Sequence, residues 1–138
     1  MVGILIITHG TLGESLVHCA SHIMGSRPHR LEQIGVTPQE DPQRVLTQAL
    51  RFVRSLDDGD GVIIFTDIFG GTPSNVASHL LVPGRIEGVA GVSVPMLIRA
   101  LTYRSEPLPV VLEKALSGGT AGVVHMPPSD HGHAATGS

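Results

Sequence analysis

The chain has 138 residues, of which 41% are hydrophobic and 15% charged, and its formal net charge is −3. These values describe one globular domain, without the basic excess that nucleic-acid binding requires and without an apolar run long enough to cross a membrane. The single cysteine excludes an internal disulfide framework, and no secretory signal is expected at the N-terminus, so we interpret the chain as cytoplasmic.

Strands and helices alternate in the first half of the chain. The apolar run over residues 3–7 predicts a buried strand. A helix over 12–24 follows, with a Thr-x-x-Glu capping box over 11–14 at its start. The apolar stripe of this helix, which would place the cysteine in the core, is expected to consist of Leu12, Leu16, Cys19, Ala20 and Ile23. A weaker strand over 31–36 and an amphipathic helix over 42–56 come next.

The second half continues the alternation. Strands are predicted over residues 61–65 and 87–92, and helices over 72–82, 93–101 and 109–116, the last of them ending at Gly118-Gly119. Together these elements predict a doubly wound α/β fold with a mainly parallel sheet of four to five strands in residues 1–126. The fifth would be an antiparallel edge strand over 122–124. Residues 127–138 are too polar to offset their ordering entropy, so we predict a disordered tail.

Two of the predicted strands end in complementary polar residues. The first leads into Thr8-His9-Gly10, and the third leads into Thr66-Asp67. In open parallel sheets the functional crevice lies beyond the carboxyl ends of the strands, so His9 and Asp67 would share one crevice if these strands are neighbours. A carboxylate bound to one ring nitrogen would fix the tautomer and leave the other nitrogen as a nucleophile.

The segment after Asp67 indicates what this nucleophile could attack. Gly70 and Gly71 allow close approach of the backbone, and a helix beginning near Thr72 would present unpaired amide groups and a hydroxyl to an anion. Gly70, Gly71 and Thr72 are therefore the predicted phosphoryl-binding residues, and His9, Asp67 and Thr72 the catalytic ones. The alternatives are that the Gly-Gly-Thr-Pro segment is only a turn with a helix cap, and that His9 is a core histidine.

Other candidate sites are weaker. His18 and His22 are four residues apart on the first predicted helix, but two exposed histidines without a third ligand are more often plain surface. His125, His131 and His133 could bind a metal only adventitiously. Neither a P-loop nor a dinucleotide fingerprint is present, so we predict no metal and no cofactor.

Three segments in the expected order resemble the mannose-family enzyme IIA domain of the bacterial phosphoenolpyruvate-dependent sugar phosphotransferase system. They are residues 8–10, 67–78 and 90–97, and the resemblance covers about residues 1–125. It implies that His9 is phosphorylated, that Asp67 is its hydrogen-bonded partner and that the Thr72 hydroxyl contacts the phosphoryl group. Two departures stand out: the family often has serine where this chain has Thr72, and tryptophan where it has Phe69.

The resemblance also implies a function and partners. His9 would accept a phosphoryl group from the phosphorylated histidine-containing phosphocarrier protein and pass it to an enzyme IIB protein during sugar uptake. The family forms homodimers with an edge strand contributed near the C-terminus. The alternative hypothesis is a regulatory module whose phosphorylation state is read by another protein. A phosphocarrier domain of the dihydroxyacetone kinase type and a plain ligand-binding module fit the motifs less well.

Overall fold

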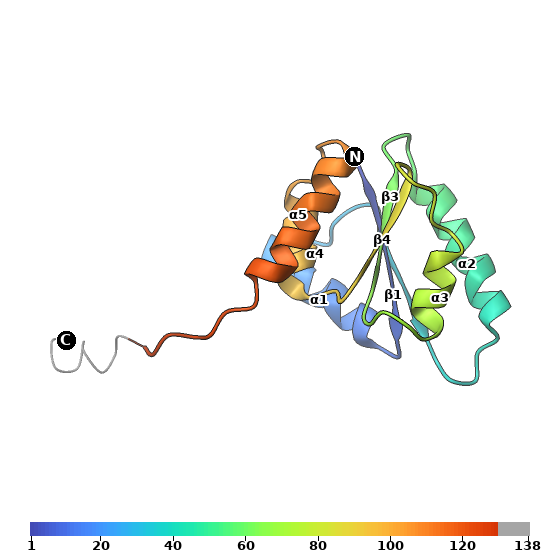
Figure 1. The fold of residues 1–138 in the computed structure, drawn as a ribbon, viewed down its shortest axis with the longest axis horizontal. Coiled ribbons are helices and arrows are strands. Elements are labelled where there is room, and N and C mark those ends of the chain that lie inside the picture. The colour runs from blue at the N-terminus through green and yellow to red at the C-terminus, as the bar shows by residue number, and fades with distance from the viewer. Residues whose placement is uncertain (130–138) are drawn as a thin grey trace, which may run out of the picture.

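A four-stranded parallel sheet forms the centre of the molecule (Figure 1). The computed structural model describes residues 1–129, and its strands are β1 (Gly3–His9), β2 (Leu31–Val36), β3 (Val62–Thr66) and β4 (Ile86–Ala90). All neighbouring strands pair in parallel, in the order β2-β1-β3-β4. The chain order reverses between β1 and β3, which is where such sheets place their functional crevice. The predicted α/β class and parallel sheet are confirmed.

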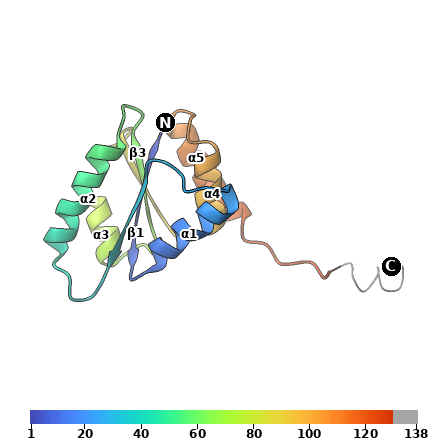
Figure 2. The same ribbon diagram turned by 180° about the vertical axis from the view of Figure 1, so that it is seen from behind.

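Within residues 1–129, five helices cover the two faces of the sheet. They are α1 (Leu12–Met24), α2 (Pro42–Leu56), α3 (Thr72–Ser78), α4 (Val94–Thr102) and α5 (Leu108–Ala121). Helices α1, α4 and α5 pack on one face, and α2 and α3 pack on the other, as the two opposite views show (Figures 1 and 2). No helix within residues 1–129 is long and apolar enough to cross a membrane.

Alternation along β1 builds two hydrophobic cores, one on each side of the sheet. Ile4 and Ile6 pack with α1, α4 and α5, whereas Leu5 and Ile7 pack with α2 and α3. All four side chains are fully buried, and each contributes about 1.5–3 kcal/mol relative to an exposed position. By the same alternation, Thr8 lies on the α1 side of the sheet and the following histidine on the side of α2 and α3.

The expected buried stripe of α1 is confirmed at Leu16 and Ala20 and wrong at its other three positions. The buried residues are Gly13, Leu16, Val17 and Ala20, whereas Leu12, Cys19 and Ile23 are exposed. The helix is rotated because Gly13, which counts as neither apolar nor polar, lies against β2: a Cβ there would be 3.0 Å from Gln33 Oε1. The capping box is also wrong, since the Thr11 side chain makes no cap hydrogen bond. The Thr8 hydroxyl accepts from the Gly13 amide at 2.8 Å in its place.

The C-terminal part of the fold also differs from the prediction. Helix α5 continues through Gly118-Gly119 to Ala121, because these glycines are packing positions: a Cβ at Gly118 would lie 2.9 Å from Arg99 of α4. Residues 122–124 form no edge strand, and residues 123–129 have no regular structure and lead away from the domain (Figure 1). The predicted boundary at residue 126 and the disordered tail stay predictions. Residues 130–138, with His131 and His133, lie outside the described residues.

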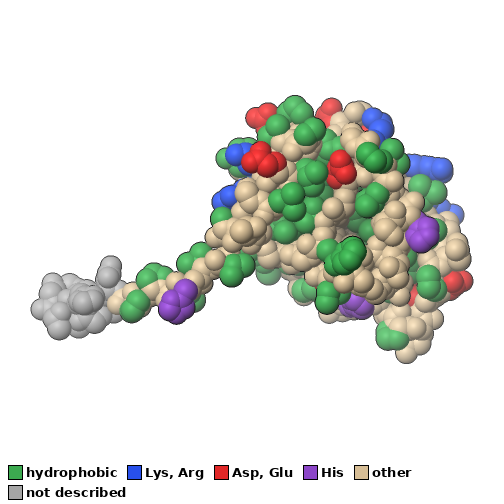
Figure 3. All heavy atoms as spheres, in the orientation of Figure 1, with side chains coloured by type: hydrophobic (Ala, Val, Ile, Leu, Met, Phe, Trp, Pro, Cys, Tyr) green, Lys and Arg blue, Asp and Glu red, His purple; other side chains and the backbone are tan. Residues whose placement is uncertain are grey.

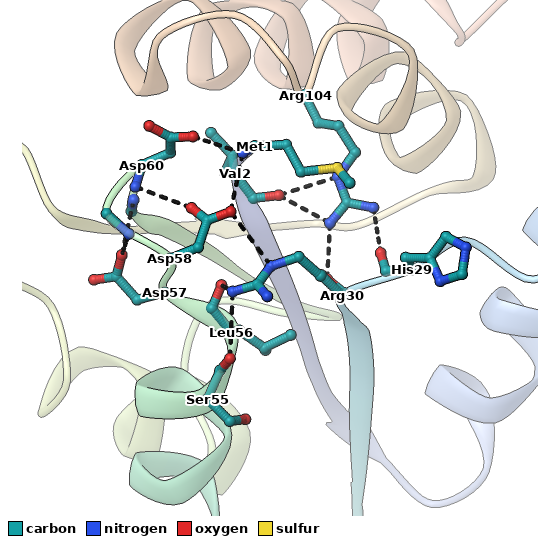
Figure 4. Close-up of polar contacts among 12 residues, drawn as sticks. Met1, Val2, His29, Arg30, Ser55, Leu56, Asp57, Asp58, Asp60 and Arg104 are labelled. Carbon is teal, nitrogen blue, oxygen red and sulfur yellow. Dashed lines mark hydrogen bonds and ion pairs between the residues drawn. The ribbon is translucent and has the colours of Figure 1, made fainter.

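The amino ends of the strands are held by a buried arginine (Figure 4). Arg104, between α4 and α5, is only 6% exposed and donates hydrogen bonds to the backbone carbonyls of Val2, His29 and Arg30. Burial, assisted by the positive charge of Arg30, lowers the pKa of Arg104 to about 10, so its guanidinium stays charged at neutral pH. Arg104 thereby joins the starts of β1 and β2 to the segment between α4 and α5.

Candidate functional site

The carboxyl ends of β1 and β3 bring a histidine and a carboxylate together. These strands pair in register up to Ile7 and Thr66, and the chain then continues to His9 on one side and Asp67 on the other. His9 Nδ1 lies 2.9 Å from Asp67 Oδ2. The predicted His9–Asp67 contact is therefore present, and the fold alone accounts for it, because adjacent parallel strands end at the same edge of the sheet.

One carboxylate oxygen holds both the backbone and the ring of His9. Asp67 Oδ2 accepts from the His9 amide at 3.0 Å as well as from the ring, and Oδ1 accepts from the Ile68 amide at 3.0 Å. Burial alone would raise the pKa of the Asp67 carboxyl, but the hydrogen bonds from the backbone and side chain of His9 outweigh it and lower the pKa. Asp67 is therefore ionised at neutral pH.

The ionised carboxylate assigns the tautomer of the neutral His9 ring. A carboxylate only accepts hydrogen bonds, so Nδ1 carries the proton that is shared with Asp67. The lone pair is then on Nε2, at the other side of the ring. The His9 side chain is 53% exposed, whereas that of Asp67 is 15% exposed. The arrangement presents a nucleophilic nitrogen to solvent, with the negative charge behind it.

Gly71 lies beside the free nitrogen. A Cβ at this residue would be 3.5 Å from both Cε1 and Nε2 of His9, so its backbone runs close to the ring edge that carries the lone pair. Gly70 and Gly71 have φ values of +97° and +87°, which residues with side chains rarely adopt. Of the predicted phosphoryl-binding residues, Gly71 is the one that the structure brings to the ring, while Gly70 makes the turn that leads to it.

Thr72 is placed next to the site, with its hydroxyl unpartnered within residues 1–129. It is the first residue of α3, and its half-buried side chain lines a groove of about 140 Å³ between α3 and α2. The structure therefore leaves this hydroxyl available beside Gly71, but within residues 1–129 it makes no hydrogen bond to His9 or Asp67. Its predicted role stays a prediction.

The loop that carries the carboxylate also presents two apolar side chains. At the rim of the site, Ile68 is 59% exposed and Phe69 is 87% exposed. Exposed aromatic side chains are common anchors in protein interfaces.

The two histidines of α1, His18 and His22, were the other candidate site. In the described part of the chain, no group of three or more metal-ligating side chains occurs around them.

Sequence reasoning missed one residue that supports the site. Thr8 is fully buried, and its hydrogen bond to Gly13 fixes the start of α1 directly beside His9. A hydroxyl at the end of an otherwise aliphatic strand was the available signal, because a buried hydroxyl needs a partner and α1 begins four residues later.

Fold and site together define a parallel α/β domain with an exposed, carboxylate-oriented histidine at the switch point of its sheet. Residues 3–113 match the family model described as the PTS system fructose IIA component. The chain therefore belongs to this family of IIA components of the sugar phosphotransferase system (PTS).

Relatives and solved structures agree with this assignment. The PTS system mannose-specific EIIAB component of Escherichia coli (strain K12) is 31% identical over 106 residues, which are 76% of this chain and 32% of that protein. This chain thus spans about a third of the length of that relative. The PTS system fructose-specific EIIA component of Bacillus subtilis (strain 168) is 27% identical, over 75% of this chain and 71% of that protein.

Among solved structures, the phosphotransferase system component EIIA from Streptococcus agalactiae is 25% identical, with a TM-score of 0.81 over 91% of this chain and 97% of that one. The mannose/sorbose-specific IIA subunit from Enterococcus faecalis has the same TM-score at 18% identity, over 93% of this chain and 96% of that one, and supports the fold alone.

Proposed function

We propose that the protein is a phosphocarrier that accepts a phosphoryl group on Nε2 of His9. The donor is the phosphorylated histidine-containing phosphocarrier protein, and the acceptor is an enzyme IIB protein in sugar uptake. The observation that carries the proposal is the 2.9 Å contact between His9 Nδ1 and Asp67, which leaves Nε2 of a 53% exposed ring free to react.

The transfer is a displacement at phosphorus between two imidazole nitrogens. The Nε2 lone pair of His9 forms a new N–P bond while the N–P bond of the donor breaks, and the donor imidazole keeps the electron pair of that bond. Bond types lost and gained are the same, so the protein has to position the groups rather than overcome a large free-energy difference. The second transfer, to the acceptor, reverses the roles.

Asp67 supports this step by orientation and by charge. Its contact with Nδ1 aims Nε2 away from the carboxylate, so the incoming phosphoryl group does not meet the negative charge directly. As the N–P bond forms, the ring gains positive charge, and the ionised carboxylate at Nδ1 stabilises it.

We assign phosphoryl binding to Gly70, Gly71 and Thr72. Gly71 supports this assignment by its approach to Nε2, since a side chain there would fill space next to the reacting nitrogen. The Thr72 hydroxyl follows directly in sequence and is unpartnered within residues 1–129, so it is available to a phosphoryl oxygen. Helix α3 has only seven residues, so we attribute little to its dipole.

We infer that the protein acts as a homodimer in the cytoplasm. Apolar side chains gather over the middle of the face shown in Figure 3, between α5 and α3, where the edge strand β4 lies. Leu81, three residues after α3, is 39% exposed and lies against Gly88 of β4. Val123 and Met126, beyond α5, are 85% and 82% exposed. A second copy would bury these groups.

The proposal is tested by incubating the protein with phosphoenolpyruvate, enzyme I and the phosphocarrier protein, followed by intact-mass analysis. Wild type should gain one acid-labile phosphoryl group, and His9→Ala should gain none. His18→Ala is the matched control, because this histidine is exposed on α1 and should leave the gain unchanged.

Two results would contradict the proposal: no gain by wild type while a known IIA protein is phosphorylated in parallel, or a gain that survives in His9→Ala. The acceptor is identified in a second step, by presenting the phosphorylated protein to an enzyme IIB protein. Loss of the phosphoryl group to that protein supports the transport role, whereas binding of a regulator to one phosphorylation state only would favour the regulatory alternative.

A further inference from the structure

The backbone of His9 is held by a strand on one side only. Pairing between β1 and β3 ends at Ile7 and Thr66, but pairing between β1 and β2 continues to His9 and Val36. On the β3 side, the Asp67 carboxylate takes the place of a strand by accepting from the His9 amide. The end of β2 is therefore the only part of the sheet that fixes the main chain of His9 within residues 1–129.

The turn after His9 is pressed against the same end of β2. The Gly10 amide donates to the Val36 carbonyl at 2.9 Å. The Gly10 carbonyl approaches Gly35 so closely that a Cβ on Gly35 would lie 2.1 Å from its oxygen and 3.2 Å from its carbon. Ordinary contact with a Cβ begins at 3.4 Å, so the smallest side chain at Gly35 would displace the Gly10 carbonyl by more than about 1 Å.

We propose that Gly35 is a positioning residue for His9, because its bare backbone lets the Gly10 carbonyl lie against β2 and so holds the ring within reach of Asp67 and Gly71. This inference rests on the phosphocarrier function proposed for His9. Gly35 does not touch the ring or the reacting atoms. It acts through Gly10, the residue directly after the histidine.

The matched pair for the test is Gly35→Ala and Gly3→Ala. Both glycines lie in strands, and both would place a Cβ against a backbone carbonyl, since a Cβ at Gly3 would be 2.5 Å from Leu56 O. Gly3 is at the opposite end of the sheet, six residues before His9 in β1. The two variants therefore have similar steric conflicts and differ in their connection to the site.

Two measurements are made on each folded variant. The first is the rate of phosphoryl gain from the phosphocarrier protein. The second is the ¹⁵N chemical shift of Nδ1 and Nε2 of His9 in the unphosphorylated protein, which reports the tautomer that the Asp67 contact fixes. The second measurement needs no phosphoryl transfer, so it tests the positioning role even if the proposed function fails because wild type gains no phosphoryl group.

We expect Gly35→Ala to slow the gain by roughly tenfold to a hundredfold, as for a reacting group misplaced by about 1 Å, and to shift the ring signals towards a mixture of tautomers. Gly3→Ala should keep the rate of phosphoryl gain within about twofold of wild type and leave the ¹⁵N signals of the His9 ring at their wild-type positions. Equal effects of the two variants, or wild-type ring signals in Gly35→Ala, would overturn the proposal.

If Gly35→Ala is unfolded, the measurements are repeated in sucrose, which favours the folded state. Failure to fold there, while Gly3→Ala folds, would also overturn it, because Gly35 would then serve the fold alone.

Discussion

The two ends of the parallel sheet use polar groups in opposite ways. At the amino end, Arg104 is 6% exposed, and its guanidinium donates to backbone carbonyls from the starts of two strands (Figure 4). At the carboxyl end, the His9 side chain is 53% exposed, and its ring has a single hydrogen-bond partner in the described residues, Asp67. The polar groups that stabilise the fold thus lie at the amino end of the strands, and the group available for reaction lies at the carboxyl end.

This separation has a physical reason. A buried guanidinium that spends four of its five N–H donors on backbone carbonyls stabilises the chain and has little left for a ligand. A histidine that must react has to keep one nitrogen free of partners, so it contributes little to the fold. Substitutions at the two ends should therefore affect different measurements, and each prediction below tests whether they do.

The largest expected effect is at the amino end. Arg104→Met would remove this donor from the buried carbonyl of Val2 and from the partly buried carbonyl groups of His29 and Arg30, and should lower the free energy of unfolding by about 3 kcal/mol. Urea unfolding measures the loss. The rate of phosphoryl gain should stay unchanged at temperatures where the variant is folded, and a slower rate in the folded variant would contradict the separation.

Arg85→Met is the control for this substitution. Arg85 belongs to the same end of the molecule, and its ion pair with Asp57 spans 2.9 Å, but its side chain is 54% exposed. An exposed ion pair of this kind contributes at most about 0.5–1 kcal/mol, so Arg85→Met should be almost as stable as wild type.

The next effect is at the carboxyl end. Asp67→Asn keeps the size of the side chain but removes the charge that, in the function we propose, stabilises the phosphorylated ring, so phosphoryl gain should slow by about a hundredfold. Its free energy of unfolding should fall by only about 1 kcal/mol, since the amide group would face the Ile68 N–H. Quench-flow mass analysis gives the rate. Asp58→Asn, which removes a carboxylate at the other end, should leave it unchanged, and an unchanged rate in Asp67→Asn would refute the role of the carboxylate.

A smaller effect is expected at the rim of the site. Phe69→Ala removes a ring that is 87% exposed, so stability should change by less than about 0.5 kcal/mol. If Phe69 is an interface anchor, KM for the phosphocarrier protein should rise about fivefold, which corresponds to about 1 kcal/mol, while kcat stays the same. Ile23→Ala, an exposed apolar residue on α1, is the control. Equal KM values for both variants would mean that the ring takes no part in docking.

The smallest effect concerns pH. The folded-state pKa of Asp67 is lowered from the ordinary value of 3.8, so its contribution to stability is present above that pH and is lost as the pH falls through the folded-state pKa. The difference in free energy of unfolding between wild type and Asp67→Asn should therefore shrink as the pH falls from 5 to below 3.8. Urea unfolding at a series of pH values measures it. A difference that grows towards acid would have the wrong sign.

The residues that could be predicted from sequence are those whose roles follow from strand patterns. Apolar runs located the strands, and because parallel strands end at one edge, the patterns also brought His9 and Asp67 together. The approach of Gly71 to Nε2 could be suspected from the glycine pair, but it depends on the positive φ values of Gly70 and Gly71, which no periodicity encodes.

The errors come from side chains whose partners are distant or absent. The rotation of α1 depends on Gly13 and its contact with β2, and the length of α5 depends on Gly118 and its contact with α4. Gly118 was misread because a glycine pair was interpreted as a helix end, and Gly13 was left out of the stripe because it has no apolar side chain; both are places of close packing. The cap at Thr8 was missed because its hydroxyl precedes the helix by a whole turn of chain.

The shared oxygen of Asp67 has a mechanical consequence. Because Oδ2 accepts from the amide and from the ring of the same residue, the imidazole of His9 cannot swing away without losing its own hydrogen bond to the oxygen that also holds its main chain. The His9 side chain therefore keeps a fixed position, unlike the flexible groups on which many carrier proteins move the group that they transfer. In the function that we propose, the donor and the acceptor must each bind at this nitrogen and dissociate in turn. The rate of phosphoryl transfer through the protein is then limited by the encounters of these partners with its surface.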